Sequence, residues 1–225
     1  MIVQLQGGRF CSMIFLRRES FKSYIRSYPG ITAIVGICIV YYLFTWLGGY
    51  LTNGYTIYSA GAFLSVPQED PVGLSQPWRY LTSMFMHADF YHLLHNMAML
   101  IIFGPPLERL IQTKRFIPFY LLSGIGGTFI ASLIYSMLGK GQLTVGASGA
   151  IYGVFGAYLF IALFRKKMVD EQSIQTIYMI LVIGIVSSIV ITTTNLWGHI
   201  GGLITGLLLY RIFDQLHIRK QYQND

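Results

Sequence analysis

The chain has 225 residues, of which 54% are hydrophobic and only 11% charged, with a formal net charge of +7 and a mean hydropathy of +0.55. A soluble domain carries about 25% charged residues, so this chain has too few charges to cover a soluble surface. The composition excludes an ordinary soluble enzyme, a disordered protein and a nucleic-acid-binding domain, and it leaves no room for a separate soluble domain.

A basic start of the chain is followed by a series of apolar runs. Residues 1–29 are polar and basic and are interpreted as a cytoplasmic N-terminal tail, with a transit peptide as the alternative. A helix that spans a bilayer needs about 20 mostly apolar residues, and six such helices fit into the chain. The six runs cover residues 31–47, 92–103, 116–138, 147–164, 174–191 and 196–213. The sequence therefore predicts an all-α membrane protein, a bundle of six transmembrane helices over residues 30–215, with a C-terminal cytoplasmic tail over residues 216–225.

A long loop, residues 48–90, separates the first two runs and is rich in aromatic and turn residues. Because Trp and Tyr prefer the membrane interface, this loop is expected to lie there. The cytoplasmic side of a membrane protein carries an excess of Lys and Arg. With the N-terminus inside, all of the 16 basic residues except Arg79 and Lys140 fall on that side. Both termini are therefore predicted to be cytoplasmic.

A few polar residues lie within the apolar runs, where such residues are costly and are therefore functional candidates. The second run starts with His92, His95 and Asn96, the fourth with Ser148, and the sixth with His199. In the predicted topology all three runs cross from the outside to the inside, so these residues lie at a similar shallow depth. We expect three helices to converge on one polar site near the outer face.

Glycines at helical spacing indicate how two of these helices meet. Gly149 and Gly153 lie four residues apart in the fourth run, and Gly202 and Gly206 do so in the sixth. Small residues at this spacing allow membrane helices to approach closely. If the two glycine faces pack, Ser148 and His199 meet at the outer end of the interface.

A serine beside a histidine is suited to nucleophilic acyl transfer, because the imidazole takes the proton of the hydroxyl. No acidic residue lies near this depth on the fourth or sixth run, so a Ser148–His199 dyad is expected rather than a triad. The imidazole must then be oriented by packing. Tyr152 lies four residues after Ser148 on the same helical face and is expected to stack on His199, the alternative being an ordinary core aromatic.

Acyl transfer also needs hydrogen-bond donors for the developing oxyanion. His92 and Asn96 lie four residues apart, on one face of the second run. The backbone N–H of Ser148, at the start of its helix, adds a donor at the positive end of the helix dipole. These groups are the predicted oxyanion hole, and a purely structural hydrogen-bonded pair of His92 and Asn96 is the alternative.

Taken together, these residues resemble the rhomboid intramembrane serine proteases. The resemblance covers about residues 30–215, and its motifs occur in the order that the family has. They are Trp78-Arg79, His92 with Asn96, Gly104-Pro105-Pro106-Leu107-Glu108, Gly146-Ala147-Ser148-Gly149, and Gly198-His199 followed by Gly202 and Gly206.

The resemblance implies an enzyme that cuts other transmembrane proteins within the lipid bilayer and needs no cofactor or metal. It implies that Ser148 is the nucleophile and that His199 is the general base and acid. His92 and Asn96, with the Ser148 backbone, would line the oxyanion hole, and Tyr152 would support His199.

Other positions matched by the resemblance are expected to be structural. Trp78, Arg79 and Glu108 would anchor the first loop, with Glu108 near the inner end of the second span. His87 fits a structural histidine of the family, whereas His95 stands where the family commonly has an apolar residue. A six-span form favours a bacterial plasma membrane, with the active site toward the outer face.

Two other functions compete with this interpretation. Rhomboid-like proteins that have lost catalysis bind membrane clients, but they lack the serine or the histidine, and this sequence has both. A metal site would use His87, Asp89, His92 and His95. Against it, the sequence lacks an HExxH motif and has no carboxylate or cysteine near this depth on another span.

The expected substrate is a single-span helix whose outer end unwinds to expose one peptide bond, because membrane helices hide their backbone. Helix-breaking residues near the cut should help. Entry is expected between the second and fifth spans, because the fifth run carries aliphatic residues with Ser and Thr and no polar anchor.

Overall fold

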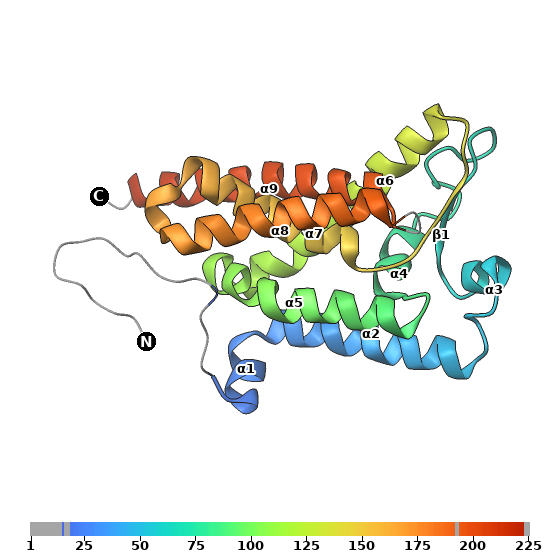
Figure 1. Cartoon of the computed structure of the whole chain (residues 1–225), viewed down its shortest axis with the longest axis horizontal. Helices are drawn as coiled ribbons and strands as arrows, with labels where there is room; N and C mark the ends of the chain where they lie inside the picture. The colour runs from blue at the N-terminus through green and yellow to red at the C-terminus, as the bar shows by residue number, and fades with distance from the viewer. Residues whose placement is uncertain (1–14, 16–18, 192–193, 223–225) are drawn as a thin grey trace.

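The structure is a computed structural model that describes residues 15, 19–191 and 194–222. Long helices run side by side; some of the short elements gather at one end of them, whereas α1 lies at the other end (Figure 1). The long helices are α2 (Pro29–Leu47), α5 (Phe90–Ile111), α6 (Thr113–Met137), α7 (Ser148–Phe164), α8 (Glu171–Val190) and α9 (Leu196–Tyr222). The short elements are α1 (Phe21–Ser27), α3 (Gly54–Ser59), β1 (Phe63–Ser65), α4 (Arg79–Phe85), β2 (Gln142–Thr144) and a 3-10 turn, η1 (Lys166–Met168).

Each of the six apolar runs falls on one of the long helices, so the predicted all-α membrane fold is confirmed. Helices α2, α6, α8 and the Leu196–Asp214 part of α9 are long and apolar enough to cross a membrane, and α7 is a shorter apolar helix. Large apolar side chains such as Val40 and Val182 are more than 60% exposed, which suits contact with lipid. The count of six spans stays a prediction, because α5 and α7 are not among these four helices of the described residues.

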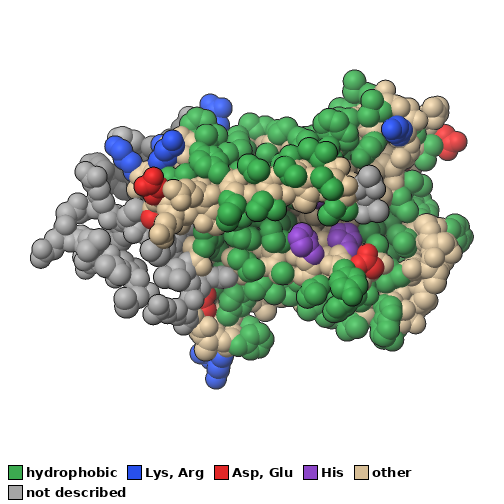
Figure 2. All heavy atoms as spheres, viewed as in Figure 1, with side chains coloured by type: hydrophobic (Ala, Val, Ile, Leu, Met, Phe, Trp, Pro, Cys, Tyr) green, Lys and Arg blue, Asp and Glu red, His purple; other side chains and the backbone are tan. Residues whose placement is uncertain are grey.

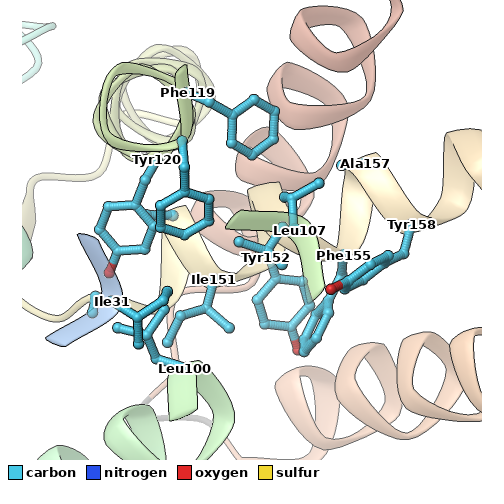
Figure 3. Packing of buried hydrophobic residues seen from close by; sticks show 14 of the residues in the cluster. Ile31, Leu100, Leu107, Phe119, Tyr120, Ile151, Tyr152, Phe155, Ala157 and Tyr158 are labelled. Carbon is cyan, nitrogen blue, oxygen red and sulfur yellow. The ribbon is translucent and has the colours of Figure 1, made fainter. Parts of the chain in front are cut away.

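Helix α7 lies at the centre of the bundle. Every residue from 150 to 162 except Leu159 is buried, and a helix that is apolar all round is expected to be surrounded by other elements. Figure 3 shows its side chains packed against those of α5 and α6. The α7 residues drawn there include Ile151, Tyr152, Phe155 and Tyr158, which lie near Leu100, Leu107, Phe119 and Tyr120.

Helix α5 continues eight residues past the predicted end of the second run, so the Gly-Pro-Pro motif lies inside the helix rather than after it. A proline has no N–H to donate to the carbonyl four residues earlier, so Pro105 donates no hydrogen bond to the carbonyl of Ile101. The Tyr24 hydroxyl of α1 donates to this carbonyl at 3.2 Å. Such replacement partners allow prolines inside membrane helices.

The sequence predicted that Glu108 anchors the first loop. In the structure Glu108 caps the start of α2 instead. Its two carboxylate oxygens accept hydrogen bonds from the backbone N–H groups of Gly30 at 2.8 Å and Ile31 at 2.9 Å. The Thr113 hydroxyl donates to the same carboxylate at 2.6 Å. The first N–H groups of a helix have no partner within the helix and favour negative charge, which explains why a buried carboxylate is stable here.

The loop between α2 and α5 is tied together by Arg79. Its guanidinium donates to the carbonyls of Tyr58 at 2.5 Å and Ala62 at 2.9 Å and lies 3.8 Å from the centre of the Tyr58 ring. The side chain of Trp78 is 57% exposed, consistent with an interfacial position. Strand β1 of this loop pairs antiparallel with β2, which the sequence did not predict, and this pairing joins the loop to the segment just before α7.

Candidate active site

The two predicted glycine faces do pack against each other. A Cβ atom added to Gly202 would lie 2.0 Å from the carbonyl oxygen of Gly149, and one added to Gly206 would lie 2.1 Å from that of Gly153. Real side chains cannot approach a backbone so closely, so α7 and α9 are in backbone contact at these positions. The contact places the first residues of the two helices next to each other.

Ser148 is the first residue of α7 and is half-buried. The turn before it depends on Gly146, which has a φ of +115° and whose N–H donates to the carbonyl of Ser83 at 2.8 Å. The residue after Ser148 faces the residue before His199, because the Cβ position of Gly149 lies 3.6 Å from the carbonyl oxygen of Gly198. The backbone therefore brings the predicted nucleophile and base to one place.

His199 is buried, with 7% of its surface exposed, and is held from two sides. The ring of Tyr152 stacks on the imidazole with a centroid distance of 4.1 Å and an interplanar angle of 7°. The hydroxyl of Ser188, on α8, lies 2.7 Å from the imidazole Nδ1. The stacking follows the spacing of Ser148 and Tyr152, whereas sequence reasoning missed Ser188.

Within the described residues, Ser148 and His199 are not joined by a hydrogen bond. Catalytic hydrogen bonds are often long in proteins without substrate and tighten only when substrate binds. The imidazole nitrogen opposite Nδ1 is the one that remains for Ser148. The roles of both residues stay predictions at this point.

His92 lies against the turn that precedes Ser148. A Cβ atom on Gly146 would lie 2.7 Å from Cε1 and Nε2 of the His92 ring, so only glycine leaves room for this contact. The buried Asn96 side chain donates to the backbone carbonyl of His92 at 2.9 Å. Both predicted oxyanion-hole side chains therefore belong to the same part of α5, and His92 is adjacent to the start of α7.

The remaining polar residues of this region have structural contacts. The Asp89 carboxylate caps α5 by accepting from the N–H of His92 at 2.9 Å. His87 is fully buried, and its burial, with a further effect of the neighbouring His92, lowers the pKa of His87 to about 3. His95 is exposed. In the described part of the chain, no three His, Cys, Asp or Glu side chains are grouped closely enough to hold a metal ion.

The fold and this geometry define a class: a mostly helical membrane protein in which Ser148 and Tyr152 of α7, Ser188 of α8 and His199 of α9 lie in one region, with His92 of α5 against the turn before Ser148. The sequence matches the Rhomboid domain family over residues 74–215. The chain belongs to the rhomboid family.

Several relatives are similar over much of this chain. The protein named "Putative rhomboid protease YdcA" of Bacillus subtilis (strain 168) is 34% identical over 87% of this chain and 94% of its own length. Rhomboid protease GluP of the same organism is 30% identical over 90% of this chain but only 39% of its own length. The mitochondrial RHOMBOID-like protein 6 of Arabidopsis thaliana is 34% identical over 60% of this chain and 43% of its own length.

Proposed function

We propose that this chain is an intramembrane serine endopeptidase that hydrolyses peptide bonds in or near transmembrane helices of other membrane proteins. The observation that carries the proposal is the backbone contact between the starts of α7 and α9, which brings Ser148 and His199 together among apolar helices. Membership of the rhomboid family supports it, and the names of the two Bacillus subtilis relatives contain the words rhomboid protease.

The reaction follows from the groups present. His199 takes the proton of the Ser148 hydroxyl, whose oxygen attacks the carbonyl carbon of the substrate. The developing oxyanion accepts hydrogen bonds from the Ser148 N–H, His92 and Asn96. His199 then gives its proton to the leaving amine, and a water molecule hydrolyses the acyl-enzyme by the same steps.

The proposed substrate is a membrane-spanning protein segment, because Ser148 and His199 belong to apolar helices of a membrane protein. A transmembrane helix satisfies its backbone hydrogen bonds internally and hides them from attack. Cleavage therefore requires local unwinding, and Gly or Pro residues near the cut favour it by weakening the helix.

We propose that substrate enters between α5 and α8. Helix α8 is the least enclosed of the long helices, and its buried residues are Ser173, Ile177 and Ser188. On the face that carries α5 and α8, histidine side chains reach the surface among mainly hydrophobic side chains, with an acidic side chain beside them (Figures 1 and 2). Disulfides that join α5 to α8 should slow cleavage, and reduction should restore it; unchanged rates in the oxidised protein would refute this entry route.

The distribution of charge supports an orientation with both ends of the chain in the cytoplasm. Lys and Arg side chains gather at one end of the bundle (Figure 2). That end contains the C-terminal end of α5, the start of α6 and the α7–α8 connection, which carry Arg109, Lys114, Arg115, Arg165, Lys166 and Lys167. By the positive-inside rule this end lies on the cytoplasmic side of a bacterial plasma membrane, and Ser148 lies toward the outside.

Reconstitution tests the proposal. The protein is placed in liposomes with a single-span substrate that carries a helix-breaking residue near its outer end. Wild type should cleave it and Ser148→Ala should not. Ser132→Ala should retain activity, because the buried Ser132 hydroxyl bonds to the carbonyl of Phe129 and to Tyr80, which both lie outside the proposed site. Equal cleavage by Ser148→Ala and wild type would refute the proposed nucleophile.

A further inference from the structure

One hydroxyl group of α8 makes three polar contacts in the middle of the proposed site. The Ser188 Oγ lies 2.7 Å from Nδ1 of His199, 3.1 Å from the Tyr152 hydroxyl and 2.7 Å from the carbonyl oxygen of Gly184. Ser188 itself is 5% exposed. A Cβ atom on Gly184 would lie 2.7 Å from the Tyr152 hydroxyl, so the small residue allows this approach.

Counting protons leaves one consistent arrangement of these contacts. A serine hydroxyl has one proton to donate and two lone pairs that accept. The Gly184 carbonyl can only accept, so the Ser188 proton must point to it. The other two contacts then need protons from the partners, one from the Tyr152 phenol and one from Nδ1 of His199. In the opposite arrangement, with Ser188 donating to Nδ1, two oxygen acceptors would face each other at 2.7 Å with no proton between them.

We infer that Ser188 is a positioning residue that holds His199 in the tautomer with its proton on Nδ1. A neutral imidazole carries one proton, so Nε2 is left with a free lone pair. This is the nitrogen that must accept the Ser148 proton, and the inference rests on that proposed role. Ser188 thereby does what a carboxylate does in a Ser-His-Asp triad, where the wrong tautomer costs about 10⁴-fold in rate.

The contact with Gly184 alone would be an ordinary feature of a membrane helix, because serine hydroxyls often donate to the carbonyl four residues earlier. The neighbouring Ser187 provides the comparison. Its hydroxyl donates to the same Gly184 carbonyl at 2.9 Å, and it makes no contact with His199. Ser187→Ala is therefore a matched control that removes a hydroxyl from the same turn of α8 without touching the imidazole.

The tautomer is measured directly by nitrogen NMR of the wild-type protein with ¹⁵N-labelled histidine, at a pH of about 8 where an ordinary imidazole is neutral. The signals of His199 are assigned by their loss in His199→Gln. The inference predicts a directly bonded proton on Nδ1 and none on Nε2. A proton found on Nε2 would overturn it, and the protonation itself is measured in the wild-type protein.

The kinetic test uses a fluorophosphonate, which modifies an activated serine without the unwinding of a helical substrate. Ser188→Ala should slow modification of Ser148 about tenfold, the factor expected for the loss of one neutral hydrogen bond. Ser188→Thr, which keeps a hydroxyl, should recover most of the rate, and Ser187→Ala should match wild type. Equal rates in Ser188→Ala and wild type, or equal slowing by Ser187→Ala, would refute the positioning role.

Failure of the proposed function would look different. In that case wild type itself would not be modified at Ser148, whereas the tautomer of His199 in the same sample would still decide the role of Ser188.

Discussion

Replacing Gly202 by alanine should separate α7 from α9 at the proposed catalytic pair. The added Cβ atom would lie 2.0 Å from the Gly149 carbonyl oxygen, against the 3.4 Å or more of an ordinary contact, a shortfall of about 1.4 Å. Neither partner is a flexible side chain, so the helices must move apart. Overpacking of this kind typically destabilises a protein by about 1–3 kcal/mol, and a 1 Å misplacement of reacting groups costs about 10²-fold in rate.

Two measurements are combined in this test: thermal unfolding in detergent and cleavage of a single-span substrate in liposomes. Gly149→Ala is the control for stability, because its Cβ would lie 3.6 Å from the nearest atom, and it should unfold like wild type. Gly36→Ala, whose Cβ would have no neighbour within 4 Å, should retain full cleavage. If Gly202→Ala unfolds at the wild-type temperature and cleaves at the wild-type rate, the close packing on which the site depends is refuted.

Three further changes follow from the contacts of single residues. Glu108→Ala leaves two N–H groups at the start of α2 without an acceptor. At about 1–3 kcal/mol for each group, it should lower the free energy of unfolding by about 2–6 kcal/mol. Glu108→Gln, which keeps one acceptor, should lose less, and equal stability of wild type and both variants in denaturant titrations would contradict the capping role. Asn96→Ala should lower turnover by about 10²–10³-fold, because it removes an oxyanion donor, and it should lower the free energy of unfolding by only about 1 kcal/mol, for the lost hydrogen bond to the His92 carbonyl. Full activity would exclude the oxyanion role. His95→Ala and treatment with a chelator should each leave cleavage unchanged, and a large loss in either assay would revive a metal-dependent mechanism.

Much of the fold could be predicted from the sequence because a bilayer imposes strong constraints on it. Six apolar runs fall on six helices, and the glycine spacings of α7 and α9 predict the contact that the structure contains. The stacking of Tyr152 on His199 follows from helical periodicity, since residues four apart share a face. These features depend on local sequence or on repeated spacing, and both are visible in a single sequence.

Features that depend on contacts between distant segments could not be predicted from the sequence. Glu108 was expected to anchor the first loop, but it caps α2, because its partners are backbone N–H groups that carry no sequence signal. The pairing of β1 with β2 joins two three-residue segments that lie 77 residues apart, from Ser65 to Gln142. Ser188 was overlooked because a serine in an apolar helix usually bonds to its own backbone; the hint was a pair of serines shortly before His199.

The central claim is that His199 activates Ser148, and the most direct measurement identifies the residue that a fluorophosphonate modifies. Mass spectrometry of the modified wild-type protein should find the label on Ser148. In His199→Ala, which loses the base that takes the hydroxyl proton, Ser148 should remain unlabelled under the same conditions. A label on a different serine, or equal labelling of Ser148 with and without the histidine, would contradict the account.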